Sequence, residues 1–145
     1  MQIDLTKEQY RHMLDMLCLG EWTANGVRLY EDRLTCYDDM LRTFCAHAEA
    51  FGFGDLVSYD AEAAAYYPND AYEQEMRPIV DQYNNAVFWQ ELVNRMAAKE
   101  ALQAGYGFLS EEAYTRAKSQ AELAYEQEFK QNGLRHVQVA KPKND

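Results

Sequence analysis

The stretch Ala86–Ala97 constrains the fold most, because its apolar residues recur at the i, i+3, i+4, i+7 spacing of one helix face. At about 100° per residue this face covers roughly half of the helix circumference, wider than the usual apolar stripe of a surface helix. One neighbouring element cannot cover so wide a face. The sequence therefore predicts a central helix over 85–98 against which the other helices pack. The residues expected to be largely buried are Phe88, Trp89, Leu92, Val93 and Met96 in this stretch, with Leu14, Leu17, Leu41 and Phe44 elsewhere.

Capping residues mark the starts of further helices along the chain. Thr6, followed three residues later by Gln9, has the pattern of a capping box. Thr35, Asn69 and Ser110 each precede an apolar helical pattern and predict the starts of three more helices. The matching C-terminal signals are Asn25-Gly26, Gly52 and Asn132-Gly133.

Proline and asparagine residues predict interruptions in the middle of the chain. A short helix over Asp60–Tyr66 is expected to close before Pro68, since the residue before a proline avoids helical geometry. Pro78 removes one backbone donor and is expected to kink or break the third helix near 74–77. Asn84-Asn85 is expected to form the turn before the central helix.

The fold class predicted from these patterns is mainly α, with about five helices in one domain over 1–145. The two ends of the chain alternate apolar and polar residues, at 1–5 and at 136–140. These segments could form a short two-stranded β pairing that joins the termini. The tail 141–145 is expected to be frayed.

The net charge of −10 is concentrated in the middle of the chain. Between Glu31 and Glu91 there are thirteen Asp and Glu residues against three Lys and Arg residues. Such a surface repels phosphates, which argues against direct binding of DNA or RNA. It suits a basic protein partner, and self-association to a homo-oligomer is the simplest version. Solubility alone is the alternative reason for the charge.

The chain carries no pattern for membrane insertion or for a disulfide framework. Its longest apolar run, Ala63 to Tyr67, is far shorter than the roughly 20 residues that span a bilayer. Cys18, Cys36 and Cys45 are odd in number, widely spaced and without a C-x-x-C pair. We therefore expect reduced thiols, no membrane contact and a cytoplasmic location.

No motif of a known catalytic or metal chemistry stands out. Cys45 and His47 are two residues apart, so they diverge on a helix and do not match zinc-ligand spacing. No G-x-S-x-G elbow and no glycine-rich phosphate loop occur. The sequence therefore gives no positive support for an enzyme, a cofactor or a metal site.

Tyrosines inside the acidic middle are the remaining candidate functional residues. Tyrosine joins a large apolar ring to a polar tip and is enriched at protein interfaces. The predicted interaction residues are Tyr59, Tyr66, Tyr67, Tyr72 and Glu73. They indicate a non-catalytic protein-interaction domain with an acidic, tyrosine-rich surface.

Two other functional interpretations stay open at this stage. The first is a small-molecule-binding protein or small enzyme with a pocket near Trp22, Cys18 and His47. The second is an acidic nucleic-acid mimic that occupies a nucleic-acid-binding partner.

Segments from the first third of the chain and the central stretch resemble a group of small bacterial proteins. They are Leu5-Thr6-Lys7-Glu8-Gln9-Tyr10-Arg11, Leu14-Asp15, Gly20-Glu21-Trp22 and the Phe88-Trp89-x-x-Leu92 box. That group has no assigned activity. The resemblance therefore implies a small helical bacterial protein and transfers no functional residue.

Overall fold

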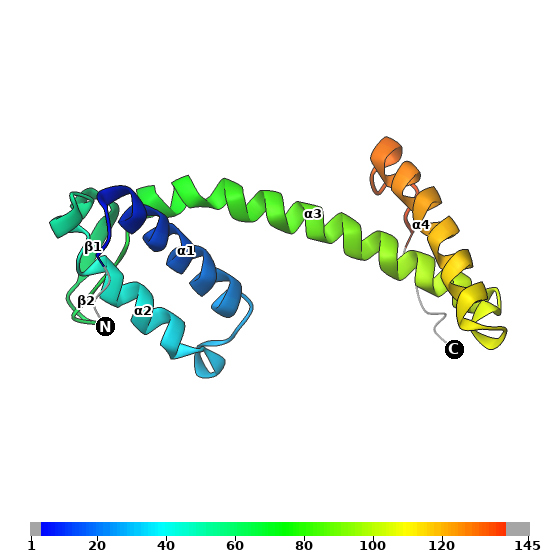
Figure 1. Cartoon of the computed structure of the whole chain (residues 1–145), viewed down its shortest axis with the longest axis horizontal. Helices are drawn as coiled ribbons and strands as arrows, with labels where there is room; N and C mark the ends of the chain where they lie inside the picture. Colours follow the sequence, from blue (N-terminus) through cyan, green and yellow to red (C-terminus); the bar gives the residue numbers. More distant parts are fainter. Residues whose placement is uncertain (1–3, 139–145) are drawn as a thin grey trace. The chain divides into compact units, whose positions relative to one another are not determined.

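The computed structural model describes residues 4–138 of the chain (Figure 1). Within these residues the fold is mainly α, with four α-helices and one two-stranded antiparallel hairpin. No described helix is long and apolar enough to cross a membrane. The elements are α1 (Lys7–Asn25), α2 (Thr35–Cys45), β1 (Val57–Asp60), β2 (Ala65–Pro68), α3 (Asp70–Gln103) and α4 (Glu111–Asn132).

The chain divides into two compact units, Met1–Gln82 and Tyr83–Asp145. The first unit contains α1, α2, the hairpin and the start of α3, and the second contains the rest of α3 together with α4. The assignment of 1–145 to one domain stays a prediction.

The predicted helix starts are confirmed at three capping residues. The Thr6 hydroxyl accepts the Gln9 backbone N–H at 3.2 Å, and the Gln9 side chain accepts the Thr6 N–H at 2.9 Å. Asn69 and Ser110 each accept a backbone N–H three residues later, at 3.0 and 3.1 Å. Thr35 begins α2 without a side-chain cap, since Leu34 holds the cap position.

The predicted short helix over Asp60–Tyr66 is wrong, because this segment forms the turn and the inner ends of the hairpin. The Asp60 carboxylate accepts the backbone N–H groups of Glu62 and Ala63 at 2.8 and 3.0 Å. These bonds satisfy two backbone N–H groups of the turn. Tyr59 and Tyr66 face each other across the strands with ring centres 5.0 Å apart, which adds a cross-strand contact. A local helix offers neither contact.

The predicted β pairing between the two ends of the chain is also wrong in its location. The strands that pair within 4–138 are consecutive in the chain, at 57–60 and 65–68. His136 lies in a turn closed by the Val137 N–H, which donates to the Leu134 carbonyl at 3.0 Å. The rest of that prediction, together with the tail 141–145, falls largely on 1–3 and 139–145, outside the described residues.

Helix α3 runs for 34 residues through Pro78 and through Asn84-Asn85. The predicted break and the predicted turn are therefore wrong. Pro78 removes one backbone donor, yet residues on both sides of it belong to the same helix. Asn84 and Asn85 are exposed, where an asparagine in a helix costs only a fraction of a kcal/mol, about 0.7 or less.

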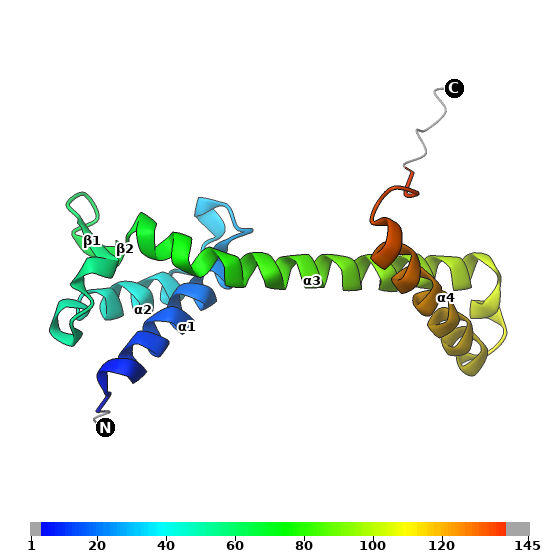
Figure 2. The same cartoon turned by 90° about the horizontal axis from the view of Figure 1, so that it is seen from above.

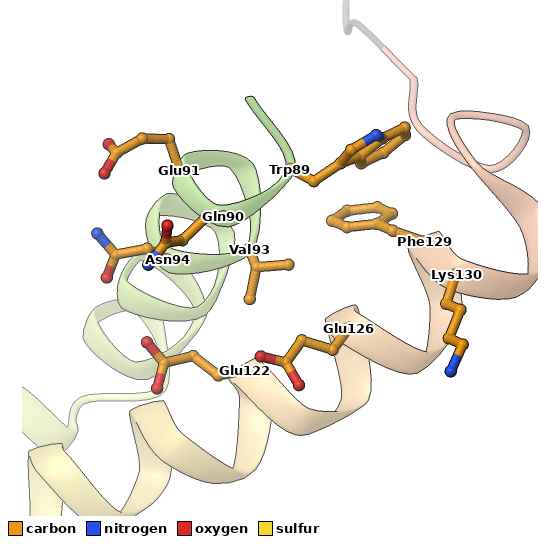
Figure 3. A pocket seen from close by; sticks show the side chains of 9 residues that line it. All are labelled: Trp89, Gln90, Glu91, Val93, Asn94, Glu122, Glu126, Phe129 and Lys130. Atoms are coloured by element: carbon orange, nitrogen blue, oxygen red, sulfur yellow. The ribbon is translucent and has the colours of Figure 1, made fainter. Parts of the chain in front are cut away.

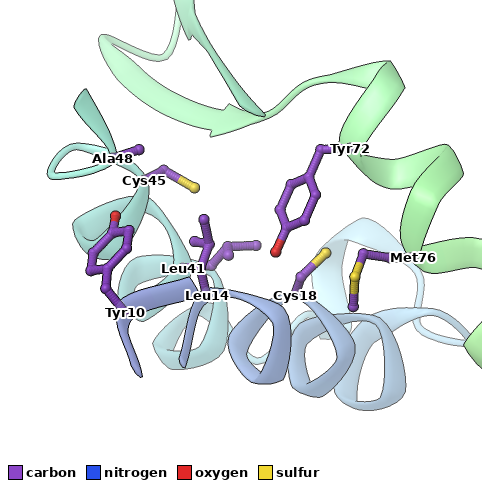
Figure 4. Close-up of a cluster of buried hydrophobic side chains, with 8 residues drawn as sticks. All are labelled: Tyr10, Leu14, Cys18, Leu41, Cys45, Ala48, Tyr72 and Met76. Carbon is purple, nitrogen blue, oxygen red and sulfur yellow. The ribbon is translucent and has the colours of Figure 1, made fainter. Parts of the chain in front are cut away.

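The principal hydrophobic core lies in the first unit (Figure 4). Helices α1 and α2 lie side by side there, as the two views in Figures 1 and 2 show. Residues four apart on α1 supply one wall, and the Tyr10 ring stacks on Phe51 with centres 4.1 Å apart. The Tyr10 hydroxyl donates to the Phe44 carbonyl at 2.5 Å. The buried cluster comprises Tyr10, Leu14, Cys18, Leu41, Cys45, Ala48, Tyr72 and Met76.

Residues 85–98 are helical as predicted, but their predicted role as the centre of the fold is wrong. Leu14 and Leu41 are buried as expected. Phe88 is 48% exposed, and Trp89 is only half-buried. The apolar face of 86–97 is divided, because only the edge that carries Val93 and Ala97 is covered within the second unit. Leu17 and Phe44 lie partly buried beside the core of the first unit.

Candidate functional site

The five predicted interaction residues lie in three different environments. Tyr59 and Tyr66 form an exposed ring pair on one face of the hairpin, and Tyr59 is 56% exposed. Tyr67 is on the opposite face, because successive residues of a strand alternate. Tyr72 and Glu73 belong to the first turn of α3. The five residues therefore do not form one continuous patch.

Tyr72 is a core residue, so its assignment to an interaction surface is wrong. Its side chain is 0% exposed, and its hydroxyl donates to the Asp15 carboxylate at 2.6 Å. The Arg11 guanidinium lies 5.0 Å from the ring centre and also pairs with Asp15 at 2.8 Å. Burial, followed by the hydrogen bond to Asp15, strongly raises the pKa of Tyr72. The residue joins α3 to α1.

Tyr67 and Glu73 meet Trp22 at a pocket of about 320 Å³ in the first unit. The end of α1, the following loop, α2, β2 and the start of α3 each contribute to its wall. Two of the three residues are predicted interaction residues, and the third belongs to the alternative pocket. The lining residues are Glu21, Trp22, Asn25, Gly26, Arg33, Asp38, Leu41, Tyr67, Pro68 and Glu73.

The base of this pocket is a buried polar cluster on α1 and the loop after it. Glu21 is 7% exposed, and its carboxylate accepts the Asn25 side-chain N–H at 3.0 Å and a short bond from Arg33. The Asn25 side-chain oxygen accepts the Leu34 N–H at 2.8 Å, which fastens the loop to the helix. This cluster was not predicted from the sequence. The i, i+4 spacing of Glu21 and Asn25 indicates that their side chains can meet on one helix face. No sequence pattern indicates that Arg33 reaches them from the loop.

Asp38 forms the side of the pocket next to Tyr67. Its carboxylate lies 3.0 Å from the Arg42 guanidinium and 3.8 Å from that of Arg33. Arg42 in turn lies 5.8 Å from the centre of the Tyr67 ring. The buried Nε of Arg42 has no hydrogen-bond partner among the described residues. Ion pairs and the contact of Arg42 with the Tyr67 ring therefore stabilise this wall of the pocket.

Glu73 differs from the other two carboxylates of the lining. Glu21 and Asp38 both pair with arginines, whereas Glu73 enters no salt bridge within residues 4–138. Burial and, after it, the negative charge of Glu73 raise the pKa of the neighbouring Cys18 thiol to about 12. Three carboxylates and one guanidinium line the pocket, so its electrostatics favour a cation.

The predicted pocket near Trp22, Cys18 and His47 is only partly correct. Trp22 lines the pocket, and the Arg77 guanidinium lies 5.9 Å from its ring centre. Cys18 is fully buried in the core, and His47 is exposed in the turn after α2 without lining the pocket. No Cys/His pair therefore meets there. The described residues include no group of three or more His, Cys, Asp or Glu positioned for a metal ion.

A second concave surface lies in the second unit, between α3 and α4, with a volume of about 810 Å³ (Figure 3). Trp89 and Phe129 face each other at its aromatic end, with ring centres 5.7 Å apart. Val93 forms part of its floor, and Glu122 and Glu126 line it from α4. The sequence predicted an apolar helix face at Trp89 but did not predict this groove. The α4 residues that complete it are distant in the sequence and reach Trp89 only through packing.

No family model, curated protein or solved structure matches this chain.

Proposed function

We propose that this chain is a non-catalytic protein-interaction domain that binds a basic side chain of a partner protein in the first unit. The observation that carries the proposal is the Glu73 carboxylate, which has no ion-pair partner among residues 4–138 and lines one pocket with Trp22 and Tyr67. Aromatic faces attract cations, and a carboxylate beside them adds a charge-assisted hydrogen bond. An arginine or lysine side chain combines both requirements.

The surroundings of the pocket support a protein partner. The middle of the chain carries thirteen acidic residues against three basic ones, which steers a basic surface toward it. Tyr59 and Tyr66 add an exposed aromatic contact on the other face of the hairpin. A tyrosine pair of this kind is typical of interface residues. Of the five predicted interaction residues, Tyr67 and Glu73 belong to the proposed pocket, and Tyr59 and Tyr66 form a separate exposed contact. Tyr72 is excluded because it is buried.

The fluorescence of Trp22 can report binding directly in a Trp89→Phe background, since the chain has two tryptophans. The probes are N-acetyl-arginine amide and its neutral analogue N-acetyl-citrulline amide. We expect the arginine derivative to change the Trp22 emission with a Kd on the order of 1 mM, because a single side chain gains little over the cost of association. The citrulline derivative should leave the emission unchanged.

Glu73→Gln provides the decisive variant, and Glu62→Gln is its matched control. Both remove one negative charge, but Glu62 lies in the exposed hairpin turn away from the pocket lining. We expect Glu73→Gln to weaken arginine binding about tenfold, which is about 1.4 kcal/mol. Equal effects of the two variants would mean that only net charge matters, and the proposed site would be rejected.

Binding of a small organic cation is a second candidate function for the same pocket. Its volume of about 320 Å³ falls at the lower end of the range of ligand sites, which is about 300–1,000 Å³. Agmatine, which has a guanidinium but no peptide backbone, separates the two candidates. Tighter binding of an arginine-containing peptide than of agmatine favours the protein partner, and the reverse order favours the small ligand.

A further inference from the structure

Helix α3 carries a stripe of two apolar and two basic residues in the second unit, of which Leu92 is half-buried and the other three are exposed. Phe88, Leu92, Arg95 and Lys99 follow one another at intervals of four, three and four residues, which places them along one line of the helix. Phe88 is 48% exposed, and the Arg95 side chain is 79% exposed. The stripe is apolar at its first half and positively charged at its second half.

Helix α4 presents the opposite pattern along the groove of Figure 3. Glu122, Glu126 and Phe129 follow one another at intervals of four and three residues and all line the groove. The row is negatively charged at its first half and aromatic at its end, where Trp89 joins Phe129.

We propose that the groove of one copy binds the α3 stripe of a second copy, with the stripe antiparallel to α4. The intervals from Leu92 to Arg95 to Lys99 are three and four, and those from Phe129 to Glu126 to Glu122 are also three and four. In this register Leu92 meets the aromatic end, and the two basic residues each meet a carboxylate. Charge complementarity at helical spacing fixes both partner choice and orientation.

The two surfaces are centred on roughly opposite sides of α3 and touch at one edge, where Glu91 of the groove lining pairs with Arg95 at 3.0 Å. At about 100° per residue, Leu92 and Asn94, which lines the groove, point about 200° apart. One copy can therefore offer its stripe and its groove at the same time. Such a head-to-tail interface forms a ring if the rotation closes and an open filament if it does not.

One charged residue of each surface already pairs within its own copy. Arg95 pairs with Glu91 at 3.0 Å, and Glu122 pairs with Lys118 at 2.5 Å, each four residues away on the same helix. The Arg95–Glu91 pair is exposed and contributes little, so a contact between copies can replace it. The Lys118–Glu122 pair is half-buried, with side chains 25% and 29% exposed, so Lys118 competes with the incoming basic residue for Glu122. Lys130 also lines the groove. It follows Phe129 at the aromatic end, so in this register it lies away from Arg95 and Lys99 of the incoming stripe.

Two double variants of the full chain test the assembly by sedimentation over a wide concentration range. One changes the stripe, Arg95→Glu with Lys99→Glu, and the other changes the groove, Glu122→Lys with Glu126→Lys. We expect the unchanged chain to sediment above the mass of a monomer and each variant to sediment as a monomer. When the two variants are mixed, the unchanged groove of one matches the unchanged stripe of the other, and the acidic stripe of the first matches the basic groove of the second. The mixture should therefore assemble like the unchanged chain, although each variant alone is monomeric.

A matched control exchanges charges elsewhere on α4, Glu112→Lys with Arg116→Glu, and should assemble like the unchanged chain. A variant with all four stripe and groove exchanges should assemble again, which also shows that the exchanges leave the fold intact. A monomeric unchanged chain, or failure of the mixed variants to assemble, would each overturn the proposal. None of these results depends on arginine binding by the first unit, so the two proposals fail separately.

Discussion

Replacing Tyr72 by phenylalanine tests whether the contact between α3 and α1 holds the first unit together. The change removes one hydroxyl and keeps the ring in the core. That hydroxyl donates to Asp15 at 2.6 Å, and the side chain is fully buried. The variant therefore isolates one hydrogen bond to a carboxylate.

The expected loss of stability follows from the burial of the two partners. A hydrogen bond to a charged group contributes about 1.5–3 kcal/mol. The Asp15 side chain is 23% exposed and keeps its bond to Arg11 at 2.8 Å, so water and Arg11 replace part of the loss. We therefore expect Tyr72→Phe to lower the free energy of unfolding by about 1.5–2 kcal/mol.

Urea unfolding of the first unit measures this loss through the fluorescence of Trp22 in a Trp89→Phe background. With a slope of about 1–3 kcal/mol/M, the midpoint should fall by roughly 0.5–2 M. The control is Tyr59→Phe, whose side chain is 56% exposed and should change stability by less than about 0.5 kcal/mol. If the midpoints of the two variants coincide, Tyr72 does not anchor α3, and the core assignment is refuted.

Three further outcomes follow from individual residues. Cys36 is exposed, whereas Cys18 and Cys45 are buried, and their pKa values are raised to about 12. A thiol reagent should therefore label Cys36 first, which mass spectrometry of the peptides measures. Equal labelling of the three cysteines would contradict the burial. Ala64 has φ 49°, so Ala64→Gly should raise the free energy of unfolding by up to about 1 kcal/mol, and a fall would contradict the strained turn. Burial raises the pKa of Tyr10 to about 12. The stabilisation from the neutral Tyr10 should be fully present below the tyrosine pKa of the unfolded chain and be lost as pH rises through the folded value. An ultraviolet titration in which all tyrosines ionise together near their ordinary pKa would disagree.

The helix starts were predictable because their signals are local. Thr6 with Gln9, Asn69 and Ser110 satisfy backbone N–H groups within three residues, so no distant contact is needed to place them. The hairpin was missed because the alanine-rich segment 61–65 is compatible with a helix on its own. Its strands depend on Asp60 binding the turn and on the pairing of Tyr59 with Tyr66.

The candidate site was only partly predictable for a related reason. Tyr67, Glu73 and Trp22 were singled out from residue type and from the acidic composition, but their meeting at one pocket depends on the packing of α1, α2, β2 and α3. Tyr72 has the same residue type and sits in the same acidic segment, yet it is buried. The difference is that Tyr72 lies one turn before Met76 on the face of α3 that meets the core.

The sequence by itself determined the mainly α character, the ends of α1 and α4 and the concentration of negative charge, since these depend on spacing and composition along the chain. Only the tertiary structure decided where the core lies, that α3 continues past Pro78 and which edge of 86–97 is covered. A helical pattern specifies which side chains share a face, but burial also requires a second surface to cover that face. That surface comes from residues far away in the sequence, and no local pattern encodes it.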